Sequence, residues 1–515
     1  MGALRDLKNS LLHNPSFTVK EQLGYSAGIF GNAMAQDSSE TYSDQFNRDF
    51  MGISNEKMTL KGNVATVLSF IVPPIAGTIM DRPTIEGHKS NTKKILGIVP
   101  LPFAVMSMLM FIVPSANPNF NFVWAFLSSL LFNVLDSFYD ISLSTISLRM
   151  TSNPDDRKNF YTISSLASTL GSMLPGWLIP IFIGRTDDPT KQQWMYFIIA
   201  LIFCIIGVSS MCAPYFTLNE KVGVNYREKE NEEKISWNKD MVLAILHNRP
   251  FMILEASVFF DAIRQVTYDM LPFLYRNVFD NYGMKAIIDV ISGTLSYAGL
   301  FAVPLVGSKV SAKNMLSFGY GYTGFFYALM SIFAIFKRDK SLPVNTALAP
   351  WVDRIRKFRW VIGVMVGLAG MPNTAQGAAR KIIVADSTDY MEWYGEKRFG
   401  VPVRSDGMLC AAKNVIDKVI KLFRVNLKYF LFGLTKYQES TKDAKTGKAV
   451  EIVQTNSTLR GIYLIFALCG LAGNLLSCVT FFFDNYTGKR KEEIFSELCE
   501  MRKIREAKQA ELSCT

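Results

Sequence analysis

The stretch QWMYFIIALIFCIIGVSSMCAPY, residues 193–215, contains no charged residue. An α-helix of about 20 apolar residues is long enough to cross the hydrocarbon core of a bilayer, which is about 30 Å thick. Comparable apolar runs recur along the whole chain, and the segments between them hold most of the charged residues. The sequence therefore predicts an all-α membrane protein with many spanning helices.

The apolar runs predict twelve transmembrane helices, near residues 23–48, 60–80, 95–114, 121–147, 160–184, 193–215, 250–278, 286–308, 314–336, 358–384, 407–434 and 459–483. A connector rich in both charges follows the sixth run, and we expect it to carry a short surface helix. This pattern predicts an N-terminal six-helix half (1–215), a cytoplasmic linker (216–249), a C-terminal six-helix half (250–488) and a cytoplasmic tail (489–515).

The short basic loops place both termini in the cytoplasm, because Lys and Arg beside spanning helices are retained on that side. One loop, 337–359, would then be external although it contains the basic runs KRDK and RIRKFR. No cleavable signal peptide is visible in the mixed, charged first 20 residues. We expect a multi-pass protein of the plasma (inner) membrane that acts as a monomer.

Composition excludes several classes of function. The net charge of +11 comes from loop Lys and Arg rather than from a nucleic-acid-binding surface. Seven scattered cysteines and three histidines in polar segments show no metal-ligand spacing, so we expect no metal and no cofactor. No nucleophile motif, HExxH or phosphate-binding loop is present, so an enzyme is not expected.

The first predicted span contains the charged stretch AMAQDSSETYSDQFNRDF, residues 33–50. On a helix its acids Asp37, Glu40 and Asp44 gather toward one side. An ionised side chain that faces lipid is costly, so such residues usually mark a water-filled cavity or an ion path. The alternative is that residues 37–50 form an external loop, but the remaining apolar segment would be too short to span.

Similar polar groups occur in later spans. The fourth contains Asp136 and Asp140, the seventh contains a polar stripe at helical spacing, and the eleventh contains Lys418. We predict a substrate site from Asp37, Glu40, Asp44, Asp136, Asp140, Tyr161, Asp261, Arg264, Tyr268, Asn373 and Lys418. Alternatively, Asp/Arg pairs lock helices together, and lysines near helix ends extend to the membrane surface.

The stretch KIIVADSTDYMEWYGEKRFGVPVRSDGMLCAAKNVIDKVI, residues 381–420, resembles the signature of the glycoside–pentoside–hexuronide:cation symporters, the melibiose-carrier family within the major facilitator superfamily. The residues that carry the resemblance are Asp386, Asp389, Tyr390, Glu392, Trp393, Lys397, Arg398, Gly407 and Lys418. Further likeness at residues 24–33, 77–90 and 140–157 extends it over most of the chain.

The resemblance implies the major facilitator fold of two six-helix halves and a secondary transporter, a symporter that moves a small polar solute by alternating access. The solute would be a sugar or glycoside. Asp140 matches an acid that contacts sugar hydroxyls, and Lys418 matches a lysine near the cation and substrate sites. Asp81 and Arg82 resemble the facilitator gating loop, although ordinary positive-inside charge also explains them. With the signature residues Asp386, Asp389 and Arg398 they are the predicted gating residues.

Departures from the family pattern concern the coupling ion. The acids that bind sodium in melibiose carriers align with Ser69 and Pro73, and the sugar-gripping acid of helix one aligns with Ala33. The helix-five arginine falls near Tyr161 and the ring-stacking tryptophan on Ser144. Proton coupling is therefore favoured over sodium, through Asp37, Asp140 and Lys418, with Asp37, Glu40 and Asp44 replacing the lost acid. The alternative is a facilitator or exchanger of a cationic or amphipathic metabolite.

Overall fold

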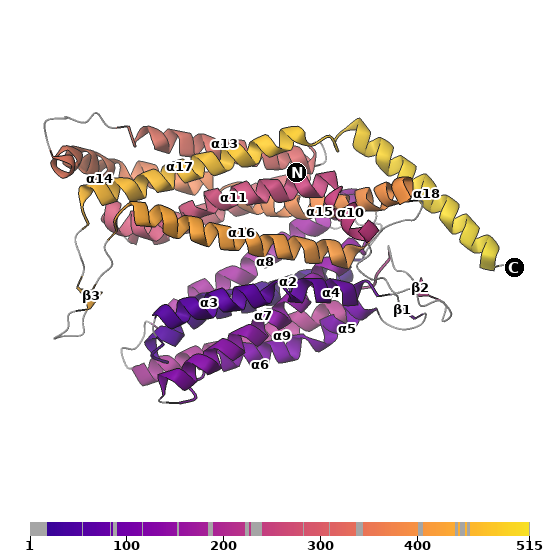
Figure 1. Ribbon diagram of the computed structural model, residues 1–515, viewed down its shortest axis with the longest axis horizontal. Coiled ribbons are helices and arrows are strands. Elements are labelled where there is room, and N and C mark those ends of the chain that lie inside the picture. The colour runs from indigo at the N-terminus through magenta and orange to yellow at the C-terminus, as the bar shows by residue number, and fades with distance from the viewer. Residues whose placement is uncertain are drawn as a thin grey trace, which may run out of the picture. The chain divides into compact units, whose positions relative to one another are not determined.

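The structure is a computed structural model that describes residues 18–53, 55–82, 84–85, 90–115, 117–151, 154–183, 189–221, 226–227, 239–281, 283–307, 310–335, 343–399, 405–437, 441–442, 449–450 and 454–513. These residues are almost entirely helical (Figure 1). Two pairs of two-residue strands accompany the helices: β1 (Thr84–Ile85) pairs in parallel with β2 (Tyr226–Arg227), and β3 (Thr441–Lys442) pairs antiparallel with β4 (Ala449–Val450).

The chain divides into two compact units, which are described separately. The first comprises Met1–Arg249, Val384–Lys418 and Gly488–Thr515. Its helices are α2 (Val19–Asp49), α3 (Asn55–Ser69), α4 (Val72–Met80), α5 (Asn91–Ile98), α6 (Pro100–Leu109), α7 (Pro118–Leu148), α8 (Pro154–Ile183), α9 (Pro189–Thr217), α10 (Lys239–Leu246) and α18 (Lys489–Ser513).

The second unit comprises Pro250–Ile383 and Val419–Thr487. Its helices are α11 (Arg249–Phe273), continued by the π-helix η1 (Leu274–Val278), then α12 (Gly283–Gly307), α13 (Ala312–Ile332), α14 (Val344–Ala369) and α17 (Asn456–Thr480), which ends in the 3₁₀ turn η2 (Phe481–Phe483). Helices α15 (Asn373–Phe399) and α16 (Asp406–Leu434) each contribute residues to both units.

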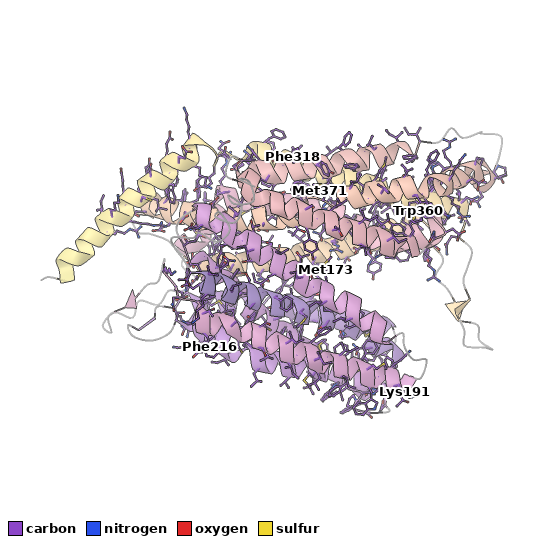
Figure 2. The ribbon with its side chains drawn as sticks, turned by 180° about the vertical axis from the view of Figure 1, so that it is seen from behind. Met173, Lys191, Phe216, Phe318, Trp360 and Met371 are labelled. Carbon is purple, nitrogen blue, oxygen red and sulfur yellow. The ribbon has the colours of Figure 1, made fainter. Side chains whose placement is uncertain are left out.

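Within the described part of the chain, five segments are long and apolar enough to cross a membrane: Leu60–Met80, Asn91–Leu109, Pro118–Leu148, Thr190–Thr217 and Asn456–Phe483. Large apolar side chains lie exposed on the outer faces of the helices, for example Phe216 on α9 and Phe318 on α13 (Figure 2). Exposed aromatic residues of this size are compatible with a lipid environment and costly in water.

Helix α2 extends without interruption from Val19 to Asp49, so residues 37–49 are helical and the alternative of a loop there is wrong. Thr18 begins the helix with a capping box, in which its hydroxyl accepts from the Glu21 N–H and the Glu21 carboxylate accepts from the Thr18 N–H. A 31-residue helix is about 46 Å long, so it is longer than the apolar core of a bilayer.

The second and third predicted spans are each broken into two helices at a proline-containing segment. Helix α4 begins at Val72 and has Pro73 and Pro74 in its first turn, and α6 begins at Pro100. Proline cannot donate the backbone hydrogen bond that would continue the preceding helix, but it fits the first turn of a new one.

The predicted external loop 337–359 is wrong for residues 344–359, which belong to α14. Trp351 and Ile355 are fully buried, and the Trp351 indole N–H donates to the Phe333 carbonyl at 2.9 Å. Arg354 and Lys357 lie exposed on the same helix, whereas residues 337–342 lie outside the described residues. The predicted span 358–384 consequently crosses the break between α14 and α15.

The short helix expected in the connector is present as α10. Residues 222–225 and 228–238 of that connector lie outside the described residues. The predicted tail from residue 489 is the helix α18. The predicted bounds of the two halves and of the linker stay a prediction.

Close helix contacts in the first unit depend on glycine. Helix α2 packs against α8 and α9, and it carries Gly24, Gly28 and Gly31 on the face that meets α9. A Cβ at Gly31 would lie 2.7 Å from the Gly207 carbonyl oxygen, and a Cβ at Gly171 of α8 would lie 2.4 Å from the Phe30 carbonyl oxygen. Small residues allow spanning helices to approach this closely.

Replacing Gly171 by alanine is expected to destabilise the protein by about 1–3 kcal/mol, because the added methyl meets rigid backbone rather than a movable side chain. The melting temperature of the purified protein in detergent measures the effect. Gly62→Ala is the matched control, since no atom lies within 4 Å of its Cβ position. An unchanged melting temperature for Gly171→Ala would contradict the packing described.

Candidate functional site

The helix-one residues of the predicted site lie in the middle of α2. Asp37 is partly buried, while the side chains of Glu40 and Asp44 lie outside the described residues. The neighbouring Gln36 donates its amide N–H to the Asp136 carboxylate of α7 at 2.7 Å. This polar contact joins α2 to the helix that carries the predicted substrate acids.

The predicted residues Asp140 and Lys418 belong to one polar group on α7 and α16. The Asn414 amide donates to the Asp140 carboxylate at 3.2 Å, and Asn414 lies one helical turn before Lys418. The Lys418 ammonium donates to the Ser69 carbonyl at 2.8 Å and to the Ser137 hydroxyl at 3.2 Å. The sequence analysis did not identify Asn414, although its position beside Lys418 in AAKNVIDKVI was a usable signal.

Tyr161 lies on α8 and is almost fully buried, with 2% of its surface exposed. Its hydroxyl is 3.1 Å from the Ser147 hydroxyl of α7, and its ring packs edge-on against Phe160. In this structure Tyr161 therefore joins α8 to α7. Its predicted role in substrate binding stays a prediction.

The predicted residues of the second unit form a compact charged group. The Asp261 carboxylate is fully buried and binds Arg264 at 2.5 Å and Arg380 at 2.9 Å. The Arg264 guanidinium also donates to the Tyr268 hydroxyl at 2.9 Å and to the Asn373 side-chain oxygen at 3.1 Å. The structure brings the four predicted residues of this unit together, and it adds Arg380, which sequence reasoning missed.

A second ion pair lies beside this group. Arg424 of α16 binds both carboxylate oxygens of Asp269, at 2.6 and 3.0 Å, and the Gln265 side-chain oxygen at 2.7 Å. Such two-point contacts are the strong form of an ion pair.

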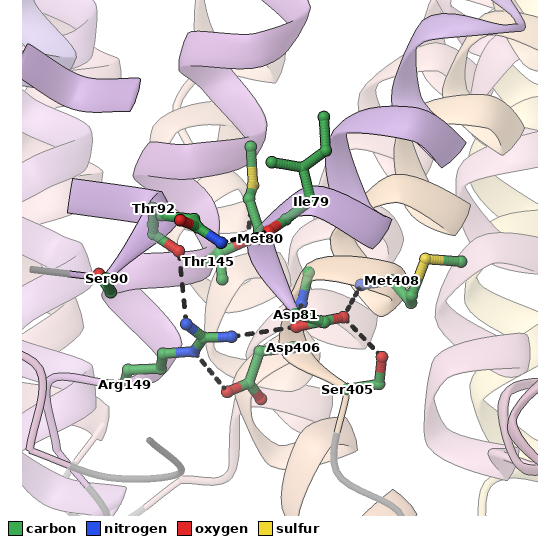
Figure 3. A network of polar contacts seen from close by, with 12 residues as sticks. Ile79, Met80, Asp81, Ser90, Thr92, Thr145, Arg149, Ser405, Asp406 and Met408 are labelled. Atoms are coloured by element: carbon green, nitrogen blue, oxygen red, sulfur yellow. Dashed lines mark hydrogen bonds and ion pairs between the residues drawn. The ribbon is translucent and has the colours of Figure 1, made fainter. Parts of the chain in front are cut away.

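The predicted gating residue Asp81 is the centre of a network in the first unit (Figure 3). Its carboxylate accepts from the backbone N–H groups of Gly407 and Met408 at 2.9 and 2.8 Å, and from the Ser405 hydroxyl at 2.6 Å. These groups form the first turn of α16, and the N-terminus of a helix binds anions in this way. A Cβ at Gly407 would lie 2.9 Å from an Asp81 oxygen, so a glycine permits the approach.

Arg149, which directly follows α7, completes the network. It binds Asp81 at 3.0 Å and Asp406 at 3.2 Å (Figure 3). It also binds Glu220 at 3.2 Å, and all four side chains are nearly buried. Burial by itself lowers the pKa of Arg149, but the charges of the three carboxylates raise it above its usual value. Burial raises the pKa of Asp81 above its usual value, although the charge of Arg149 and the hydrogen bond from Ser405 act in the opposite direction.

The signature acids on α15 form another network. Arg157, at the start of α8, binds Asp389 at 2.6 Å and lies 3.8 Å from Asp386. From α18, Arg502 binds Asp389 at 3.0 Å and Glu392 at 2.5 Å. Three further contacts join α15 to α18: Lys491 with Asp386, Arg505 with Glu392, and the Trp393 indole with Glu497.

The remaining predicted gating residues are exposed. Arg82 follows Asp81 outside the network, and Arg398 lies in the last turn of α15. Sequence reasoning identified three acids of these networks, Asp81, Asp386 and Asp389, but missed Arg149, Arg157 and Arg502. The gating role of the acids stays a prediction. Arg149 and Arg157 both lie in DISLSTISLRMTSNPDDR, where two arginines close to a helix end were the available signal. Among the described residues no group of three or more His, Cys, Asp and Glu could hold a metal ion.

Replacing Arg157 by glutamine is expected to destabilise the protein by about 3–5 kcal/mol, because the buried carboxylates of Asp386 and Asp389 each lose one of their two cationic partners. Arg157 is 2% exposed and the Asp389 side chain 4%. The melting temperature in detergent reports the loss. Lys285→Gln is the control, because its partner Asp289 is 49% exposed and such pairs contribute only about 0–1 kcal/mol. Equal effects of the two substitutions would contradict this interpretation.

The raised pKa of Asp81 predicts a dependence of stability on pH. In the folded protein Asp81 retains a proton that it releases near pH 4 in the unfolded chain. The contribution of Asp81 to the free energy of unfolding is therefore full below about pH 4, and it is lost as the pH rises through the raised pKa of the folded protein. The melting temperature of the wild type should therefore fall relative to that of Asp81→Asn as the pH rises from about 4 to about 8. A difference between the two proteins that stays constant over this range would contradict the prediction.

The chain matches the family described as MFS/sugar transport protein over residues 24–488. It is 24% identical to the isoprimeverose transporter of Lactiplantibacillus pentosus, over 75% of this chain and 75% of the relative. It is 21% identical to the glucuronide carrier protein homolog of Escherichia coli strain K12 (96% and 98%), and 21% identical to a putative sulfoquinovose importer of Salmonella typhimurium (72% and 80%).

Solved structures share the fold. The E. coli fucose:proton symporter FucP in its outward conformation has a TM-score of 0.58 and 12% identity, covering 90% of this chain and 99% of FucP. A bacterial homologue of the iron transporter ferroportin, in its outward-facing state, has a TM-score of 0.58 and 10% identity, with coverages of 90% and 98%. The fold class and the family resemblance predicted from the sequence are confirmed. The protein is an integral membrane transporter that belongs to the MFS/sugar transport protein family.

Proposed function

We propose that the protein is a symporter that moves a sugar or glycoside by alternating access, with the polar group of Asp140, Asn414 and Lys418 binding the solute. The observation that carries the proposal is the contact of these side chains between α7 and α16, inside the predicted spans 121–147 and 407–434. Polar and charged groups are rare in spanning helices and mark solute and ion pathways. A carboxylate beside an amide and an ammonium offers both acceptors and donors, which sugar hydroxyls require.

The relatives support a sugar-type solute. The three named above are described as an isoprimeverose transporter, a glucuronide carrier homolog and a putative sulfoquinovose importer. The alternative of a cationic solute is less favoured by the contacts in the second unit. There Asp261 is neutralised by Arg264 and Arg380, so its carboxylate is not open to a cation.

Proton coupling is favoured over sodium by the position of Lys418. Its ammonium binds the carbonyl of Ser69, the residue that aligns with a sodium-binding acid of the melibiose carriers. A fixed positive charge at that place repels a sodium ion, and the carboxylates that would bind one are missing. Asp140 is the proposed proton carrier because it is a carboxylate within a predicted span. The helix-one acids Asp37, Glu40 and Asp44 are proposed as further members of the pathway.

Gating is proposed for the two charged networks of the first unit. The Asp81–Arg149–Asp406 network joins the ends of α4, α7 and α16, and the network of Asp386 and Asp389 joins α15 to α8 and α18. Helices linked by buried ion pairs separate only if those pairs break together. We place this end of the unit, with both termini, in the cytoplasm because its loops are basic.

Uptake into proteoliposomes tests the function. Neutral and acidic glycosides are offered with either a proton or a sodium gradient, and accumulation driven by the proton gradient is expected. Asp140→Asn and Lys418→Gln should each reduce uptake at least about tenfold, because each loses a charged hydrogen bond worth about 1.5–3 kcal/mol. Lys413→Gln on the same helix is the control, since Lys413 pairs with Asp417 instead.

Three results would contradict parts of this proposal. If none of the offered glycosides accumulates under either gradient, sugar transport is wrong. If a sodium gradient alone drives accumulation, the assignment of the proton is wrong while sugar transport stands. If Asp140→Asn and Lys418→Gln transport as the wild type does, the site is wrong.

A further inference from the structure

Two arginines of the second unit share one carboxylate. The Asp261 oxygens accept from Arg264 at 2.5 Å and from Arg380 at 2.9 Å, while the neighbouring Asp269 is bound by Arg424 instead. The Arg264 side chain is 7% exposed and that of Arg380 is 24% exposed. Two positive charges, largely removed from water, therefore stand against one negative charge. Such a surplus is costly unless another group compensates it.

Hydrogen-bond donors outnumber acceptors around Arg380. Its Nη2 donates to the Tyr320 hydroxyl at 2.6 Å, so the oxygen of this fully buried tyrosine is used as an acceptor and its proton is left to donate. Among the described residues nothing accepts that proton. The Nε of Arg380 is buried, and it too has no hydrogen-bond partner within the described part of the chain. Each of the two side chains therefore has an unused donor.

Gln376 lies one helical turn before Arg380 on α15 and supplies a third unused donor. It is 2% exposed, yet neither its amide nitrogen nor its amide oxygen has a hydrogen-bond partner among the residues that the structure describes. Buried polar side chains are nearly always hydrogen-bonded, so an amide without partners indicates a group that completes the site.

The three donors belong to a single contact between α13 and α15, inside the second unit. A Cβ at Gly319 of α13 would lie 2.7 Å from the Gln376 amide nitrogen, and the next residue, Tyr320, accepts the hydrogen bond from Arg380. Gln376 and Arg380 share one face of α15, because residues four apart are neighbours on a helix surface. The unused donors and the surplus charge thus lie on one polar surface.

The group that fits this surface accepts hydrogen bonds and carries one negative charge. A water molecule or a sugar hydroxyl group brings further donors and no charge. A small monovalent anion accepts from several N–H and O–H groups at once, donates to none, and neutralises the second arginine.

We propose that the second unit binds a small monovalent anion, chloride, between α13 and α15, through the Arg380 Nε, the Gln376 amide N–H and the Tyr320 hydroxyl. The Gln376 oxygen accepts from a water molecule that hydrates the ion. The chloride stays with this unit and compensates the charge that Arg264 and Arg380 share. The inference goes beyond the proposed function, because the ion is separate from the transported solute and from the coupling ion.

The melting temperature of the purified full-length protein in detergent at neutral pH tests the proposal without requiring transport. Sodium chloride replaces sodium gluconate stepwise at constant ionic strength, so the screening of the other ion pairs stays the same. The melting temperature of the wild type should rise along a saturating curve, by about 2 °C or more, because a ligand that binds only the folded state stabilises it by mass action.

Two substitutions separate a bound ion from a merely structural role of the site. Arg380→Gln removes the surplus charge, and Gln376→Glu places a carboxylate where the ion would bind. Each should lose the response to chloride and should melt in gluconate at or above the temperature of the wild type. A structural role alone would lower the melting temperature in both salts and keep the difference between them. If Arg380→Gln does not fold, Gln376→Glu gives the answer, because it keeps both arginines.

Arg424→Gln is the matched control, because it removes an arginine of the same unit whose partner is Asp269. It should retain the response to chloride, whatever its effect on the melting temperature itself.

Equal melting temperatures of the wild type in chloride and in gluconate would overturn the proposal. A response to chloride that survives in both Arg380→Gln and Gln376→Glu would overturn the assignment of the residues. Neither result depends on the solute or on the coupling ion, so both would leave the proposed function as it stands.

Discussion

An arginine removed from water must be surrounded by carboxylates, and this requirement organises the structure around Arg149. Its guanidinium meets acids that follow α4, begin α16 and lie beyond α9, so their ends must come together for it to be buried. Asp81 adds a second constraint, because its carboxylate caps the first turn of α16. The glycines at 77 and 407 are a consequence, since a side chain at either would prevent the approach.

The same requirement explains why α15 carries so many charges. Its later turns supply Asp386, Asp389 and Glu392, and these are matched by Arg157 of α8 and by Arg502 of α18. The C-terminal helix is thus attached to the first unit by these ion pairs, together with the buried side chains of Ile494 and Leu498. Its earlier turns supply Asn373, Gln376 and Arg380, where the match is incomplete.

Much of the fold was predictable because apolar length is a local property of the sequence. The stretch 193–215 lies within α9, and the charged first span is the continuous helix α2. The segment 337–359 was mispredicted because its local charge was taken as evidence for a loop. Its arginines and lysines suggested a loop, but Trp351 and Ile355 of α14 are buried in the second unit, while Arg354 and Lys357 of the same helix are exposed. Charge in a short segment does not distinguish a loop from a helix with one buried face.

Some residues of the candidate site could be predicted from the sequence and others could not. The acids at 81, 140, 261, 386 and 389 were identifiable from the sequence, because a carboxylate in or beside an apolar run is costly and therefore stands out. The local partner Arg264 of Asp261 was identifiable as well, but partners distant in sequence were not, because Arg380 is 119 residues from Asp261 and Asp406 is 257 residues from Arg149.

The sequence by itself determined the class of protein, the helices and the family, all of which depend on apolar periodicity and on a signature within a few turns. The tertiary structure decided which charged side chains from distant segments neutralise one another. Electrostatic pairing acts over a few ångströms in space, whatever the separation along the chain.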